Sequence, residues 1–115
     1  MIDNNKETHR AIMNQAASLT IDTTILKDII SLAEVVKYNP QAERDLYFLL
    51  DRLAPQERAE VYALYNLGRA GVRSFNVALG GAQRQNPQHI AGMLAEKGNL
   101  AQCLNAGLKR YRRQS

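Results

Sequence analysis

The sequence predicts an all-α protein, a compact single-domain bundle of five to six short helices. Apolar residues recur at helical spacing through most of the chain, and the alternating β-branched runs typical of strands are missing. All 3 prolines stand where a helix is expected to begin. At 115 residues and 45% hydrophobic content, the chain suits one core. We expect a weakly ordered N-terminal segment over residues 1–18 and a helical domain over residues 19–115.

Two helices are predicted in the first half of the domain. Thr20 or Asp22 can cap the first helix. This helix ends before Pro40, because the residue before a proline is pushed out of helical angles, and Asn39 can cap the second helix. The predicted core positions are Ile25, Leu26, Ile29, Ile30, Leu32, Ala33 and Val36 in the first helix, and Leu46, Leu49, Leu50 and Leu53 in the second.

The most informative stretch is residues 53–71, LAPQERAEVYALYNLGRAG, which predicts an amphipathic helix with a start, one buried face and a stop. Pro55 suits the first turn, and Glu60 lies near the positive end of the helix dipole. Gly68 or Gly71 can take the left-handed conformation that ends a helix. The predicted buried face consists of Val61, Leu64, Tyr65 and Gly68.

Three more short helices are expected after this stretch. Gly80 and Gly81 weaken the first by about 1 kcal/mol each relative to alanine, and favour a kink or a close helix contact there. Asn86 caps the next helix, Gly98 ends it, and Asn99 caps the last. Their predicted core positions are Phe75, Ala78, Leu79, Ala82, Ile90, Met93, Leu94, Leu100, Cys103, Leu104, Leu108 and, if the stripe extends, Tyr111.

Three stretches between about Leu19 and Tyr111 carry a resemblance to a known family. They read LTIDTTILKDII, LLDRLAPQERAEVYALYNLGRAG and HIAGMLAEKGNLAQCLNAGLKRY. Together they resemble a bacterial domain of unknown function, family 3775, a group of uncharacterised all-helical proteins. The intervening GVRSFNVALGGAQRQ departs from the family pattern, which often has acidic residues there. The resemblance implies a helical fold, and it implies no activity, cofactor or catalytic residue.

Charge is distributed unevenly along the chain. Residues 1–67 hold seven Lys or Arg against ten Asp or Glu, a net charge of −3, whereas residues 68–115 hold eight against Glu96 alone, a net charge of +7. Such a division can attract an anionic partner. It can equally let an acidic and a basic face meet within the fold or between subunits.

Reactive residue types occur without partners at catalytic or metal-binding spacing. Cys103 shares a helical face with Leu104, so we expect it to pack in the core, and neither His9 nor His89 has a second ligand at metal spacing. No apolar run approaches the roughly 18 residues of a membrane span. We expect a cytoplasmic, non-catalytic protein without cofactor, metal or membrane association. Its clustered carboxylates are expected in first turns and on outer faces: Glu43, Asp45, Asp51, Glu57 and Glu60.

Tyr62, Tyr65 and Arg69 share one flank of a predicted helix. One interpretation places the tyrosines in the core, with Asn66 or Arg69 as hydroxyl partner. The other makes this flank an aromatic and arginine-lined recognition patch, the composition that protein interfaces concentrate. Two aromatic residues of the preceding helix could meet it: Tyr47 and Phe48.

The chain ends in KRYRRQS, which contributes Lys109, Arg110, Arg112 and Arg113. These cations can complement the dipole of the last helix, or they can contact phosphates. Our leading hypothesis is a non-catalytic macromolecular binding or self-association module, a homodimer or the partner of another protein. The alternative is a nucleic-acid-associated or regulatory protein that uses this cluster together with Arg69, Arg73 and Arg84.

Overall fold

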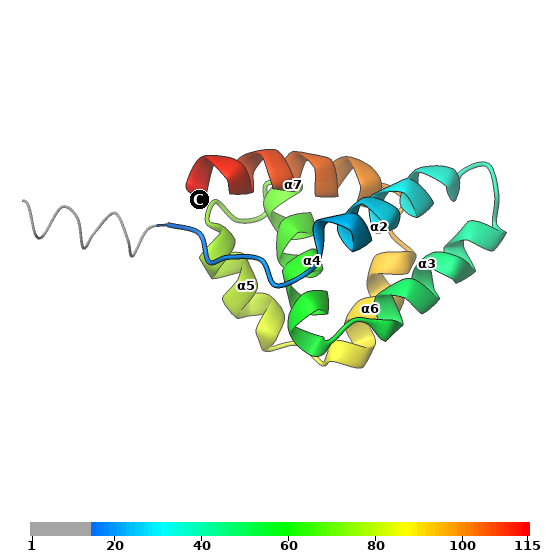
Figure 1. Ribbon diagram of the computed structural model, residues 1–115, viewed down its shortest axis with the longest axis horizontal. Helices are drawn as coiled ribbons and strands as arrows, with labels where there is room; N and C mark the ends of the chain where they lie inside the picture. Colours follow the sequence, from blue (N-terminus) through cyan, green and yellow to red (C-terminus); the bar gives the residue numbers. More distant parts are fainter. Residues whose placement is uncertain (1–14) are drawn as a thin grey trace, which may run out of the picture.

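Six helices form the described part of the chain, residues 15–115 of the computed structural model. They are α2 (Thr23–Val35), α3 (Gln41–Arg52), α4 (Pro55–Gly68), α5 (Phe75–Gln83), α6 (Pro87–Ala95) and α7 (Leu100–Gln114), as Figure 1 shows. No strand occurs among these residues, so the predicted all-α class and the number of short helices are confirmed. None of the described helices combines the length and apolarity needed to cross a membrane.

Three of the predicted helix caps are present. The side-chain oxygens of Asp22, Asn39 and Asn86 each accept a hydrogen bond from the backbone N–H two residues later, at 2.7–3.0 Å. These bonds satisfy N–H groups that have no partner inside the helix. Asn99 stands at the start of α7 but makes no side-chain cap bond. Its oxygen instead accepts a hydrogen bond from the hydroxyl of Tyr65 at 3.3 Å, so Asn99 holds the predicted N-cap position without capping the helix by its side chain.

Helix α4 lies at the centre of the molecule, with α7 crossing it and α5 and α6 on its other sides (Figure 1). Val61, Ala63, Leu64 and Leu67 are fully buried, and Tyr65 is 4% exposed. Together with Ala59 and Glu60 they cover most of the circumference of the helix rather than one stripe, and the flank that carries Tyr62 and Asn66 is partly buried. The prediction of a single buried face is therefore wrong, because neighbouring helices surround α4.

The crossing of α4 and α7 depends on two glycines. A Cβ atom on Gly68 would overlap the carbonyl oxygen of Cys103, and one on Gly107 would overlap the carbonyl oxygen of Leu64. Only the absence of a side chain lets the two backbones approach this closely. At the glycine pair of α5 the sequence predicts a kink or a close helix contact. The close contact is wrong, because a Cβ on either of those glycines would meet no atom within 4 Å.

Helix α4 ends at a left-handed residue that is not a glycine. Ala70 has a φ of 63°, whereas no glycine of the described chain has a positive φ. The N–H of Ala70 donates to the carbonyl of Leu67 at 3.3 Å, and that of Gly71 donates to Asn66 at 3.1 Å, the two bonds of a Schellman turn. The prediction of a left-handed Gly68 or Gly71 is wrong because Gly68 stays helical at the crossing, which moves the turn to residue 70.

The chain before α2 lies against α5 and α7 (Figure 1). The N–H of Ala16 donates to the carbonyl of Gln114 at 2.8 Å, and the hydroxyl of Tyr111 donates to the carbonyl of Ala17 at 2.8 Å. The described part of the segment predicted to be weakly ordered, residues 15–18, is therefore hydrogen-bonded to the domain. The rest of that segment lies outside the described residues.

A buried carboxylate also holds this N-terminal chain in place. Glu60 on α4 is 0% exposed. Its oxygens accept hydrogen bonds from the N–H groups of Thr20 and Ile21 at 2.8 and 3.0 Å, from the Thr20 hydroxyl at 2.7 Å and from the Gln56 amide at 3.1 Å. The prediction of an outer-face position for Glu60 is wrong, because the preceding chain covers it and supplies the donors that a buried carboxylate needs.

Most predicted core positions are buried. Leu50, Leu64, Phe75, Leu94 and Leu104 are each 0% exposed. The partly buried exceptions lie at the edge of the core: Ile25, Leu32, Val36, Leu49, Met93, Leu108 and Tyr111.

Candidate functional site

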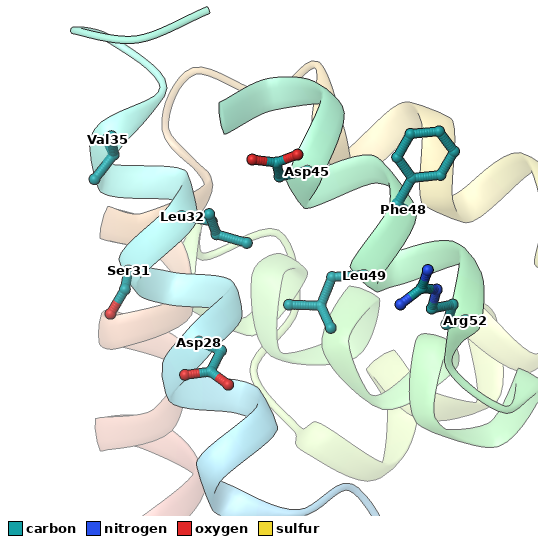
Figure 2. A pocket seen from close by; sticks show the side chains of 8 residues that line it. All are labelled: Asp28, Ser31, Leu32, Val35, Asp45, Phe48, Leu49 and Arg52. Carbon is teal, nitrogen blue, oxygen red and sulfur yellow. The ribbon is translucent and has the colours of Figure 1, made fainter. Parts of the chain in front are cut away.

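A surface groove with a volume of about 630 Å³ lies between α2 and α3, which run antiparallel (Figure 2). Each helix lines it with four residues at positions i, i+3, i+4 and i+7, the spacing of one helical face. We call this feature the α2–α3 groove. Its lining consists of Asp28, Ser31, Leu32 and Val35 from α2 and Asp45, Phe48, Leu49 and Arg52 from α3.

Apolar side chains form the floor of the α2–α3 groove, and its rims combine apolar with polar side chains. Leu32 and Leu49 point toward one another across the floor in Figure 2, and both are partly buried against the core. Val35 is 43% exposed and Phe48 is 45% exposed. Neighbouring exposed apolar side chains of this size mark interaction sites more often than isolated ones do.

The exposed aromatic side chains of α3 form their own small cluster beside the groove. The rings of Tyr47 and Phe48 meet edge to face with centroids 5.8 Å apart, and the Arg44 guanidinium lies 5.7 Å from the centroid of Phe48. The prediction that these rings meet Tyr62 and Tyr65 is wrong. The leucines of α3 occupy its inner face, so Phe48 is 45% exposed and Tyr47, 37% exposed, lies beside Gly92 of α6.

Tyr65 belongs to the core rather than to a surface patch. It is 4% exposed, and its hydroxyl donates to Asn99, so the predicted partner, Asn66 or Arg69, is wrong. The guanidinium of Arg69 stacks over the Tyr65 ring at 5.7 Å, as helical spacing suggested. Tyr62 is partly buried against the core. The tyrosine flank is thus mainly a packing feature.

The loop between α4 and α5 and the last turns of α7 form a second pocket, with a volume of about 510 Å³. We call it the arginine pocket, because Arg73, Arg110 and Arg113 line it. Its remaining lining residues are Ala70, Val72 and Gln114, so none of them is acidic.

The other basic candidates do not line this pocket. Arg84 follows the C-terminal end of α5, whereas the N-terminal end of that helix is the one nearer the arginine pocket (Figure 1). Lys109 and Arg112 are exposed on α7 outside the pocket lining, and Arg69 stacks on Tyr65. Of the basic residues that the sequence grouped together, Arg84 therefore lies apart from the pocket, whereas Lys109 and Arg112 share the end of α7 that lines it.

Sequence reasoning missed one structural role and one surface. Arg58 is 8% exposed and joins the start of α4 to α6, donating to the carbonyls of Leu53 at 3.0 and 3.2 Å and of Pro87 at 2.7 Å. The α2–α3 groove was missed as well. The signal that could have revealed it is the face of α3 that carries Asp45, Phe48, Leu49 and Arg52 at positions i, i+3, i+4 and i+7. This face places the large apolar side chain of Phe48 beside charged residues.

The residue types that could perform catalysis or hold a metal are dispersed. In residues 15–115 no group of three or more His, Cys, Asp or Glu is arranged to bind a metal ion. Cys103 is 6% exposed, in agreement with the prediction that it packs in the core. His89 is exposed near the start of α6, and His9 lies outside the described residues.

Comparison of the chain with protein-family models, with curated proteins and with solved structures found no match. Membership of family 3775 stays a prediction from the three sequence stretches. Function is therefore inferred from the geometry of the chain itself.

Proposed function

We propose that this protein is a non-catalytic self-association module in which two copies bind one another through their α2–α3 grooves. The observation that carries the proposal is the pair of half-exposed apolar side chains, Val35 and Phe48, on opposite rims of a groove with an apolar floor. A partner that inserts an apolar side chain between the rims removes both from water. Burial of one Phe or Val side chain contributes about 1.5–3 kcal/mol when complete.

The charge order along α3 favours a second copy as the occupant. Asp45 and Arg52 stand seven residues apart on the groove face, with Phe48 and Leu49 between them. If two α3 helices pack antiparallel about a two-fold axis between Phe48 and Leu49, Asp45 of each copy faces Arg52 of the other. The same axis directs each Phe48 into the groove of the other copy. A two-fold interface requires such a self-complementary surface.

The expected affinity is modest. Association costs at least about 4 kcal/mol in lost translational and rotational freedom, which offsets much of the apolar burial available from four side chains. The two charge pairs add orientation more than affinity. We therefore expect a dimer with a Kd in the micromolar range.

Sedimentation velocity over roughly 5–100 μM tests the proposal, since a Kd of 100 μM corresponds to about 5.5 kcal/mol. The wild-type protein is expected to shift from monomer to dimer across this range, and Phe48→Asp is expected to stay monomeric. Val77→Asp is the matched control. Val77 is 64% exposed on α5, so this variant adds the same charge to a different exposed apolar site and is expected to dimerise normally. A wild-type protein that stays monomeric at 100 μM contradicts self-association.

A charge exchange on α3 tests the two-fold geometry separately. Asp45→Arg alone places two arginines opposite one another, and Arg52→Asp alone places two aspartates together, so each is expected to weaken the dimer. The double variant restores opposite charges at both contacts and is expected to recover wild-type association. Failure of the double variant to recover, with circular dichroism unchanged, contradicts this arrangement.

A further inference from the structure

We infer that the arginine pocket binds a phosphate group of a nucleic-acid backbone. Arg73 comes from the loop between α4 and α5, whereas Arg110 and Arg113 come from the last turns of α7. The fold thus gathers three cations from two separate elements around one pocket with no acidic lining residue. The planar guanidinium presents parallel N–H groups that match the oxygens of a phosphate.

The walls of the pocket are held in place before any ligand binds. The Nη1 group of Arg110 donates to the carbonyl of Leu67 at 2.6 Å, which leaves most of its five N–H donors for other acceptors. Gln114 donates from Nε2 to the carbonyl of Arg73 at 2.8 Å, and its Oε1 accepts from the N–H of Phe75 at 2.8 Å. These bonds attach the loop that carries Arg73 to the end of α7.

Neutralisation of helix dipoles accounts for only part of this positive charge. The C-terminal end of α7 lies at the pocket and that of α4 directly precedes the loop that lines it, and each carries about half a negative charge. Their sum is about one negative charge, against three full positive charges on the arginines. The excess positive charge leaves a positive potential at the pocket, which attracts an anion from solution.

The surroundings of the pocket favour a chain of phosphates over a single one. Lys109 and Arg112 are exposed on the same end of α7, just outside the pocket, where they can contact neighbouring phosphates. No aromatic side chain lines the pocket, so it offers no platform on which a base could stack. Contacts restricted to phosphates predict binding without sequence preference.

Fluorescence anisotropy with a labelled single-stranded oligonucleotide of mixed sequence tests this inference. The full-length protein is expected to bind with a Kd of about 10⁻⁶–10⁻⁴ M at about 50 mM salt, and to weaken as salt rises. Arg73→Gln and Arg113→Gln are each expected to reduce the steepness of the log–log salt dependence by about 0.7 for the lost contact. Arg84→Gln is the matched control, because it removes the same charge at the far end of α5 and is expected to leave the steepness unchanged.

Three outcomes overturn the inference. The first is no binding at a protein concentration of about 100 μM in the lower salt, weaker than ordinary non-specific association. The second is an equal effect of Arg84→Gln and Arg73→Gln, which would assign binding to net charge rather than to the pocket. The third is complete displacement of the oligonucleotide by millimolar inorganic phosphate at constant ionic strength, which would identify a free phosphate as the ligand. Persistence of binding against phosphate supports the nucleic-acid backbone.

Discussion

Two pairs of neighbouring helices in this protein meet in opposite ways. Helices α4 and α7 cross at Gly68 and Gly107, where each glycine meets the backbone of the other helix. Helices α2 and α3 are also neighbours, yet they leave a groove of about 630 Å³ with apolar side chains on its rims exposed to water. The first pair has small residues where the helices touch, and the second has large apolar residues where they separate.

The difference indicates which contact serves folding and which is available to a partner. A crossing at backbone distance has no room for adjustment, because packed interiors tolerate little change in volume. The half-exposed side chains at the groove rims can be substituted at small cost to stability. Surface substitutions usually alter the free energy of unfolding by less than about 0.5 kcal/mol. We therefore expect substitutions at the crossing to affect stability, and substitutions at the groove rims to affect association.

The largest expected effect is that of Gly68→Ala. The added methyl group would overlap the Cys103 carbonyl oxygen, which belongs to rigid backbone, so the two helices must move apart. We expect the free energy of unfolding to fall by an amount on the order of 4 kcal/mol or more, which is at the upper end for substitutions that overpack a core. Urea unfolding followed by circular dichroism measures it. A loss below about 1 kcal/mol would show that α4 and α7 do not meet at this distance.

Effects of intermediate size are expected when a leucine is replaced by alanine. The loss of stability should be larger for a leucine at the crossing than for one in the groove. Leu64 is 0% exposed, so Leu64→Ala is expected to cost on the order of 2–5 kcal/mol. Leu49 is partly buried on the groove floor, and Leu49→Ala is expected to cost about 1–2 kcal/mol. Thermal melting separates them, because each 1 kcal/mol moves the Tm of such a domain by about 4–8 degrees. Equal shifts for the two variants would abolish the distinction between the two regions.

The smallest expected effect has the opposite sign. A Cβ at Gly81 meets no atom within 4 Å, and Gly81 lies inside α5 with helical backbone. Gly81→Ala is therefore expected to stabilise the protein by about 0.5–1 kcal/mol, because alanine loses less backbone entropy in a helix. The same substitution is thus destabilising at the crossing and stabilising in open space. Destabilisation by Gly81→Ala would reveal a contact on this face of α5, for example with a partner.

Local sequence signals predicted much of the fold. Asp22, Asn39 and Asn86 mark helix starts in the structure because a side-chain oxygen next to a helical run serves its own backbone and needs no distant residue. The apolar stripes likewise identified most of the core. The site was predicted less well, because the α2–α3 groove depends on the separation of two helices and the arginine pocket on two segments about 40 residues apart.

The sequence by itself determined the helices, three of their N-terminal caps and most of their inward faces, since these depend on interactions within a few residues. Only the tertiary structure decided the roles of residues whose partners are distant in the chain. Glu60 is buried because the chain at Thr20 covers it, and Gly68 is helical because α7 crosses there. That crossing in turn gives the left-handed position to Ala70, although glycine is the usual residue for it. Packing geometry overrode the local preference because the cost of one left-handed alanine, about 1–2 kcal/mol, is smaller than the cost of separating two central helices.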